Sequence, residues 1–135
     1  EWKEFNNILD LDIDLKKIFF MHCVSSYPLK EENVNFPKLF KIKDAHNKIG
    51  YSGHLKGVED AIAAISFGAM IVEKHFTIDN DLPGRDNKFA LLPMEMKIIS
   101  NYRDIFSKMN IDKGLNIQEC EMDIYKNYRG RWSKN

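Results

Sequence analysis

Residues 50–86, GYSGHLKGVEDAIAAISFGAMIVEKHFTIDNDLPGRD, decide the fold of this chain. A first strand, Ile49 to Ser52, leads into this segment and is followed by an alanine-rich stretch. The apolar residues of that stretch recur at spacings of three and four, as on one face of a helix. Gly68 ends the helix, since glycine tolerates left-handed geometry, and Ala69 to Val72 is a short apolar run that suits a buried parallel strand. The segment therefore predicts a strand–helix–strand unit.

A histidine follows each of these two strands. His54 comes just after the first strand, and His75 follows the second in the run Glu-Lys-His-Phe. Neighbouring strands lie roughly 4.8 Å apart, and an imidazole nitrogen binds a divalent metal at roughly 2.0–2.2 Å. Two such side chains can therefore share one ion, and we interpret His54 and His75 as candidate metal ligands. The alternative is that each histidine only caps a strand or bonds to a backbone carbonyl.

The flanking sequence continues the alternation of strand and helix. The run Ile18 to Val24 predicts a strand that ends in a Ser-Ser-Tyr-Pro loop, and Glu31 to Ala45 predicts a helix with Asn35 as its N-cap. The loop Thr77 to Lys88 is long enough to be functional, and Pro93 opens a last long amphipathic helix. Three successive βα units predict parallel strands joined by right-handed crossovers.

The two ends of the chain do not follow this alternation of strands and helices. An apolar stripe over the first ten residues, with no capping residue ahead of it, indicates the end of a helix that begins earlier. We assign residues 1–114 to one α/β segment. Residues 115–135, which hold few apolar side chains, are interpreted as a partly ordered tail or linker towards a further domain.

Composition excludes several classes of protein. The 135 residues suffice for one domain, and Lys plus Arg balance Asp plus Glu at 20 each, so no net charge attracts nucleic acid or an anionic membrane. Two cysteines are too few for a disulfide framework or a zinc ribbon. We expect no membrane-spanning helix and no signal peptide. The expected location is the cytoplasm.

Four motifs in order, MHCVSSYP, GYSGH, GAMIVEKHF and PGRDNKFAL, resemble the sialic acid synthase family. The resemblance spans residues 17–109. Enzymes of that family condense phosphoenolpyruvate with an N-acetylated amino sugar to form nine-carbon acids. The resemblance implies an α/β fold, specifically a partial TIM (β/α)8 barrel. A complete barrel takes roughly 250 residues, so the chain would supply about the last three βα units.

The resemblance also implies roles for individual residues. His54 and His75 would hold a divalent metal, manganese or magnesium, which polarises the sugar aldehyde as a Lewis acid. The implied catalytic carboxylates are Glu73 and Asp86. The residues implied in substrate binding are Ser25 and Ser52 towards phosphoenolpyruvate, Tyr27 towards the sugar, and Asp86 and Lys88 in the PGRDNKFAL motif.

Three further residues receive structural interpretations. His22, just inside a strand end, is interpreted as a barrel-core histidine with satisfied hydrogen bonds, and His46 as a solvated loop residue. Lys74 alternates with its neighbours along a strand and should point to the opposite face of the sheet.

One position departs from the family pattern. Gly53 stands where the family usually has an aspartate before its first metal-binding histidine. This departure suggests weaker metal binding, which an aspartate at position 53 would strengthen.

Two other functions remain open. One is a different metal-dependent aldol-type barrel, and the other is a non-catalytic binding or assembly module derived from such a barrel. The expected protein partner is either a second copy of the chain or the remaining half of the barrel, since three strands leave two unpaired sheet edges.

Overall fold

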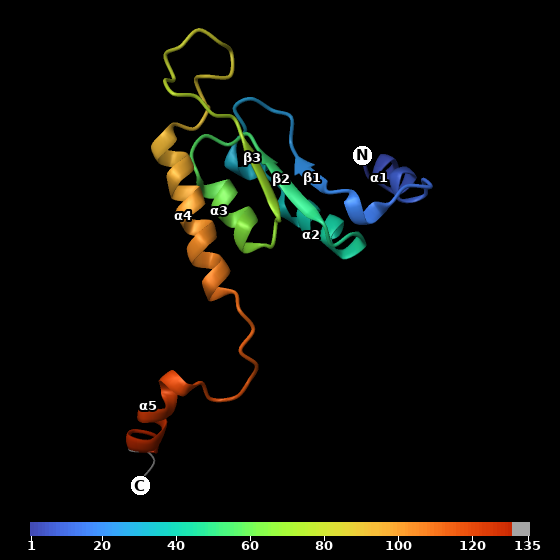
Figure 1. Cartoon of the computed structure of the whole chain (residues 1–135). Helices are drawn as coiled ribbons and strands as arrows, with labels where there is room; N and C mark the ends of the chain where they lie inside the picture. The colour runs from blue at the N-terminus through green and yellow to red at the C-terminus, as the bar shows by residue number, and fades with distance from the viewer. Residues whose placement is uncertain (131–135) are drawn as a thin grey trace.

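Three parallel strands form the centre of the structure, a computed structural model that describes residues 1–130 (Figure 1). The strands are β1 (Phe20–Cys23), β2 (Ile49–Gly53) and β3 (Ile71–Lys74), arranged in the order β1-β2-β3. Residues 131–135 of the predicted tail lie outside the described range. The α/β class and the three parallel strands are confirmed.

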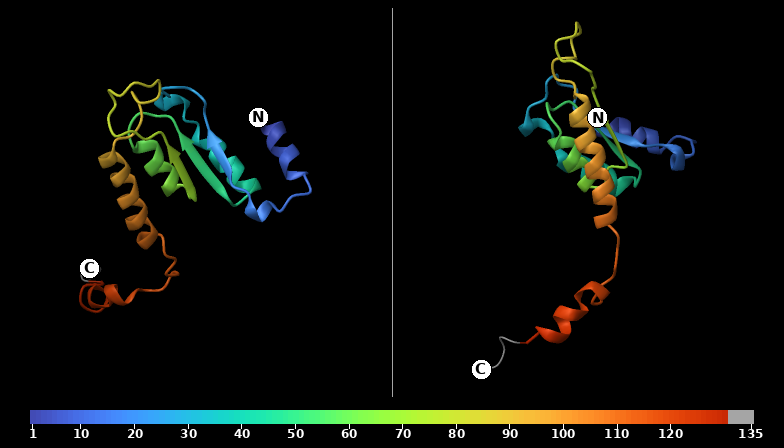
Figure 2. Two further views of the ribbon diagram at one scale, coloured as in Figure 1. Left: turned by 45° about the horizontal axis from the view of Figure 1, so that its top comes forward. Right: turned by 60° about the vertical axis from the view of Figure 1, so that its left-hand side comes forward.

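Five α-helices and three 3-10 helices surround or follow the sheet within residues 1–130. They are α1 (Trp2–Leu9), η1 (Leu15–Lys17), η2 (Glu31–Asn33), α2 (Phe36–Ala45), α3 (Glu59–Ser66), α4 (Pro93–Met109), η3 (Glu119–Glu121) and α5 (Met122–Asn127). Helix α2 packs on β1 and β2, α3 packs on β2 and β3, and α4 lies against α3 (Figure 2).

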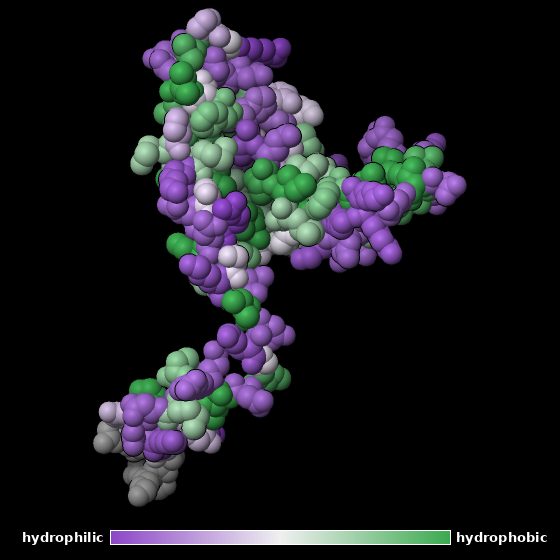
Figure 3. Space-filling model, in the orientation of Figure 1, coloured by the Kyte–Doolittle hydropathy of each residue, from purple (hydrophilic) through white to green (hydrophobic). Residues whose placement is uncertain are grey.

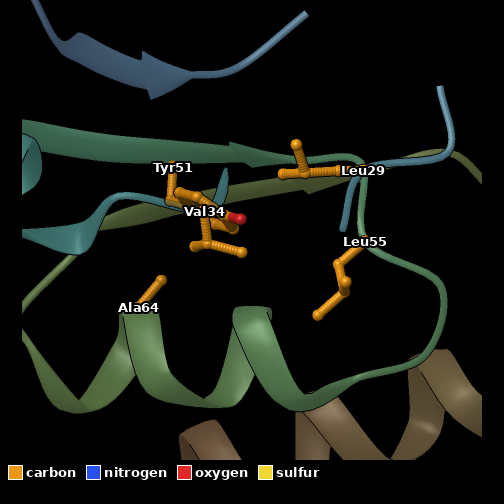
Figure 4. Close-up of a cluster of buried hydrophobic side chains, with 5 residues drawn as sticks. All are labelled: Leu29, Val34, Tyr51, Leu55 and Ala64. Carbon is orange, nitrogen blue, oxygen red and sulfur yellow. The ribbon is translucent and has the colours of Figure 1, made fainter. Parts of the chain in front are cut away.

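The core lies between the sheet and these helices. Tyr51 of β2 is 1% exposed and packs with Val34 and Ala64 (Figure 4). Leu29 and Leu55 complete this cluster beside the carboxyl ends of the strands, where their backbones form an isolated parallel bridge. The loops that follow β1 and β2 are thereby anchored to the core, which restricts their movement near the strand ends.

The predicted boundaries of two strands shift by one or two residues. The strand predicted over 18–24 is β1, which is shorter, and the strand predicted over 69–72 is β3, which starts and ends two residues later. Glu73 and Lys74 therefore lie within the strand rather than beyond it. The helix predicted within Glu31–Ala45, with Asn35 as its N-cap, is α2, and the short η2 precedes it. Asn35 stands at the N-cap of α2 with φ 55° but without a side-chain capping bond. Gly68 adopts a positive φ of 93°, as predicted for a helix end.

His22 is a core residue, as predicted. It is 1% exposed, and its Nε2–H donates to the Val34 carbonyl at 2.7 Å. Its hydrogen bonding is only half satisfied, because Nδ1 is buried without a partner in the structure. Burial lowers the pKa of His22 and keeps the ring neutral.

The interpretation of His46 as a solvated residue is wrong. Its Nε2–H donates to the Ile18 carbonyl at 3.0 Å, and its ring meets the Phe20 ring edge-on at 4.9 Å. The ring is half-buried and ties the end of α2 to the segment that enters β1. The neighbours of His46 in the sequence are polar, so nothing in the sequence indicated this contact with a residue 28 positions away.

The tail departs from the end of α4 and extends away from the sheet (Figures 1 and 2). Within residues 115–130 it contains η3 and α5, and every residue of this part is exposed. The described part of the chain contains no helix with both the length and the apolar character needed to cross a membrane.

Candidate functional site

The carboxyl ends of β2 and β3 bring together two of the predicted site residues. Ser52 and Glu73 are partners in the parallel register, so their side chains lie on the same face of the sheet. The Ser52 hydroxyl donates to Glu73 Oε1 at 2.7 Å. Ser52 is buried whereas Glu73 is exposed, so the carboxylate is available to a molecule above the sheet.

The two histidines lie side by side at this edge. His54 directly follows β2 and His75 directly follows β3, and their ring centroids are 5.3 Å apart. His54 Nδ1 is 2.8 Å from the Val24 carbonyl. A carbonyl can only accept, so Nδ1 carries the proton and Nε2 keeps a free lone pair. The loop after β1 therefore sets the tautomer of a neutral His54.

An aromatic cluster borders the two histidines. The Tyr27 ring lies 4.3 Å from the His54 ring and 5.8 Å from the His75 ring. Phe89 contacts both Tyr27, at 5.8 Å, and His75, at 5.2 Å. Sequence reasoning did not select Phe89, although it lies in the PGRDNKFAL motif. Tyr27 is 45% exposed, so its hydroxyl-bearing ring can face a ligand while one side packs on His54.

The loop between β3 and α4 brings Asp86 towards this cluster. Asp86 Oδ2 is 3.7 Å from His75 Nδ1, which is too long for a direct hydrogen bond. Lys88 is exposed in the same loop. Within residues 1–130 it forms no hydrogen bond or ion pair with the residues of this cluster. The loop projects beyond the carboxyl ends of the strands (Figure 1).

Ser25 lies at the margin of the site. Its hydroxyl is 3.9 Å from Cys23 Sγ, which in turn is 4.0 Å from His54 Nδ1. Cys23 shares the face of the sheet that carries Ser52, because the two residues are paired in register. The half-buried thiol of Cys23 thus lines one side of the site.

The spacing of the two imidazoles is compatible with a shared divalent cation, but among the described residues no third protein ligand is arranged beside them. With metal–nitrogen distances of about 2.1 Å, two imidazoles on one ion place their ring centroids about 5 Å apart, close to the spacing seen here. Within residues 1–130, no group of three or more His, Cys, Asp or Glu side chains is arranged as a metal site. Among these residues the two histidines are the groups that could hold an ion, and two ligands would leave coordination positions for water or substrate oxygens.

Position 53 does not face the histidines. A Cβ added to Gly53 would lie 2.4 Å from Asp60 Oδ2, 2.7 Å from Tyr51 Cε1 and 2.9 Å from Lys74 Cδ. These atoms belong to the helix-facing side of the sheet. This geometry does not favour the suggestion that an aspartate here would strengthen metal binding, because its carboxylate would meet another carboxylate in a packed space.

We expect Gly53→Asp to destabilise the chain. Overpacking alone costs about 1–3 kcal/mol, and a second carboxylate beside Asp60 adds repulsion. The free energy of unfolding, measured by urea denaturation, should fall by at least this amount, whereas Asn110→Asp at an exposed helix end should change it little. A Gly53→Asp protein that is as stable as the wild type and binds manganese more tightly would restore the interpretation from sequence.

Comparisons with known proteins agree with this architecture. The sialic acid synthetase of Leptospira borgpetersenii, solved in complex with citrate, superposes with a TM-score of 0.71 at 32% identity, over 87% of this chain and 41% of that one. The N,N'-diacetyllegionaminic acid synthase of Campylobacter jejuni is 38% identical over 85 residues, which are 62% of this chain and 25% of that protein. The human N-acetylneuraminate-9-phosphate synthase is 39% identical over 83 residues, which are 57% of this chain and 22% of that protein.

The extent of the match defines what these comparisons show. The chain spans about a quarter of the length of the curated relatives it matches. The model of the NeuB family matches residues 4–113, which include all three strands and the whole candidate site. Because this match covers most of the chain, and because relatives named as sialic-acid-type synthases share it, the chain belongs to the NeuB family, as the resemblance to sialic acid synthases implied.

Proposed function

We propose that this chain contributes the carboxyl-terminal part of a barrel active site that condenses phosphoenolpyruvate with an N-acetylated amino sugar. The product would be a nine-carbon acid of the sialic acid type. One observation carries the proposal: the Ser52–Glu73 pair and the adjacent His54 and His75 rings lie at the same carboxyl edge of a parallel sheet. In (β/α)8 enzymes this edge is the catalytic one.

His54 and His75 are the residues that would hold a divalent cation, manganese or magnesium. When bound, the ion supplies Lewis-acid polarisation of the sugar aldehyde. The chain's own contribution is to present the Nε2 lone pair of His54, by holding the proton on Nδ1 with the Val24 carbonyl. The Asp86 carboxylate near His75 adds negative charge, which favours a cation at this place.

Glu73 and Tyr27 would act on the substrates. The Glu73 carboxylate accepts a hydrogen bond from Ser52, so one oxygen is oriented while the other remains free to accept a proton or a sugar hydroxyl. Tyr27 packs on His54 and exposes the rest of its ring, which suits a sugar ring stacked on it. Ser25, Ser52 and Lys88 are proposed on the phosphoenolpyruvate side, where hydroxyl and ammonium donors suit phosphate and carboxylate oxygens.

A segment exchange tests the function. The matching segment of the Campylobacter jejuni synthase is replaced by this chain, and the chimera is assayed with phosphoenolpyruvate, N-acetylated amino sugars and manganese. We expect a nine-carbon acid whose formation requires phosphoenolpyruvate, and we expect Glu73→Gln in the chimera to abolish it. The chain by itself should form none, because positioning of the second reactant needs further strands.

Other results of the exchange would support the alternatives. Product formed from an aldehyde without phosphoenolpyruvate would indicate a different metal-dependent aldol-type enzyme. A folded chimera that binds the sugar without turnover would indicate a non-catalytic binding module.

A further inference from the structure

Lys74 lies between two residues of the candidate site but faces the other side of the sheet. Glu73 and His75 flank it in sequence, and their side chains lie on the face with Ser52 and His54. Alternation along β3 sends Lys74 towards α3, as the sequence predicted. Its side chain is only 3% exposed, which is rare for lysine and requires partners for the ammonium group.

The ammonium group reaches from β3 across the end of β2. Lys74 Nζ donates to the Leu55 carbonyl at 2.5 Å and to the Asp60 carboxylate at 2.9 and 3.1 Å. Leu55 directly follows His54, and Lys74 directly precedes His75. One buried cation therefore connects the backbone beside one histidine to the strand end beside the other.

Asp60 anchors this connection to helix α3 and to the core. Its side chain is fully buried, and it accepts from the Tyr51 hydroxyl at 3.0 Å and from the Ala61 amide at 2.8 Å. Burial, followed by the charge of Asp60, raises the pKa of Tyr51, so the phenol stays protonated as a donor. The carboxylate thus has partners on β2 and α3 in addition to the ammonium group.

Gly53 provides the space that the lysine crosses. The Cβ position of residue 53 lies 2.9 Å from Lys74 Cδ and 2.4 Å from Asp60 Oδ2, so a larger residue would displace the ion pair. A buried ion pair contributes little net stability compared with apolar residues of the same volume. Fixing one arrangement of the chain is the best-attested use of such a pair, and here the arrangement includes the spacing of two histidines.

We propose that Lys74 is a positioning residue of the site, which holds His54 and His75 at their mutual spacing through Leu55 and Asp60. The proposal deepens the proposed function and rests on it where metal binding is concerned. Its geometric part, the spacing of the two rings, does not depend on any ligand. Lys74 itself touches neither substrate nor metal.

The test compares variants that remove this connection with variants that remove similar bonds elsewhere. Lys74→Met combined with Asp60→Asn deletes both charges and keeps an acceptor for Tyr51. Gly53→Ala leaves both charges in place but occupies the space of the lysine, so it serves if the double variant does not fold. Tyr51→Phe removes a bond to the same carboxylate, and Lys43→Met removes a lysine-to-carbonyl bond to Phe67 at the far end of α3.

Two measurements are made on the 135-residue chain. The first is the nuclear Overhauser contact between the imidazole protons of His54 and His75 without metal, and the second is manganese affinity by calorimetry. We expect both controls to keep the contact and the affinity. The double variant and Gly53→Ala should lose the contact and bind manganese at least about 10-fold more weakly, as expected when a group that orients a ligand is removed.

The outcomes separate this proposal from the proposed function. If the wild type binds no manganese, the metal assignment fails, and the ring contact alone decides the role of Lys74. A contact that persists in both the double variant and Gly53→Ala would overturn the positioning role. An equal loss of contact in Tyr51→Phe would also overturn it, because the effect would then follow general stability rather than the connection between the strand ends.

Discussion

Replacement of His75 by alanine is expected to abolish binding of manganese by this chain. The candidate site holds two imidazole rings whose centroids are 5.3 Å apart. Within residues 1–130, no third His, Cys, Asp or Glu side chain is arranged with them as a metal ligand. Loss of a residue that only orients a ligand costs about 10–100-fold in metal affinity, so loss of one of two ligands should cost more than about 100-fold. Magnesium, which keeps most of its water, should bind more weakly than manganese from the start.

Calorimetric titration of manganese into both proteins measures this effect. His46→Ala is the matched control, because it also removes a half-buried imidazole, but one that lies near the amino-terminal end of β1 and not at the carboxyl edge of the sheet. Wild type and His46→Ala should release similar heats, whereas His75→Ala should release none. Equal heats from wild type and His75→Ala would remove the metal assignment, and the histidines would then be strand-end caps.

The sequence predicted most of what depends on local pattern. Apolar runs that alternate with amphipathic stretches identified the three strands and the helix from Pro93 to Met109. The positive φ of Gly68 follows from the end of an apolar helical stripe. The placement of both histidines at strand ends also follows from local pattern, because parallel strands carry their carboxyl ends to one edge.

Contacts between distant segments were beyond such reasoning. An acidic residue in the first turn of a helix is an ordinary surface feature, so Asp60 offered no sign that it is buried against Lys74. Gly53 was interpreted as a missing carboxylate, although its neighbours show that it makes room for one. His46 was misjudged for the same reason, since its partner carbonyl is 28 residues away.

The separation of the two faces of the sheet explains how one strand end serves two purposes. On β3, Glu73 faces the site while Lys74 binds Asp60 of the helix layer. On β2, Ser52 faces the site while Gly53 leaves space for that ion pair. A change on the helix side can therefore alter the site without removing any residue that contacts a ligand.

The chain by itself is expected to associate at micromolar concentration. Helices α2 and α3 pack on one face of the sheet, whereas on the other face Ile71 is 41% exposed beside the exposed Glu73. Apolar side chains also gather over the region of the strands on the surface seen in Figure 3. Strands β1 and β3 are the edges of the sheet within residues 1–130, and unpaired edges recruit further strands.

The favourable free energy of association depends on how much apolar surface is uncovered. If the uncovered apolar face measures roughly several hundred Å², its burial at roughly 25 cal/mol per Å² would contribute on the order of 10 kcal/mol, enough to offset much of the cost of association. We propose the remainder of the barrel as the partner, with a second copy of the chain as the alternative.

Light scattering on a size-exclusion column decides whether association occurs. We expect a mass above that of the 15.8 kDa monomer. Ile71→Lys places a charge on the uncovered face and should shift the chain towards monomer, whereas Ile111→Lys, at an exposed site beyond α4, should not. A compact wild-type monomer with dispersed amide signals would mean that three βα units cover their own sheet face, and the proposed barrel arrangement would then be wrong, because the surface that a barrel places inside would already be occupied.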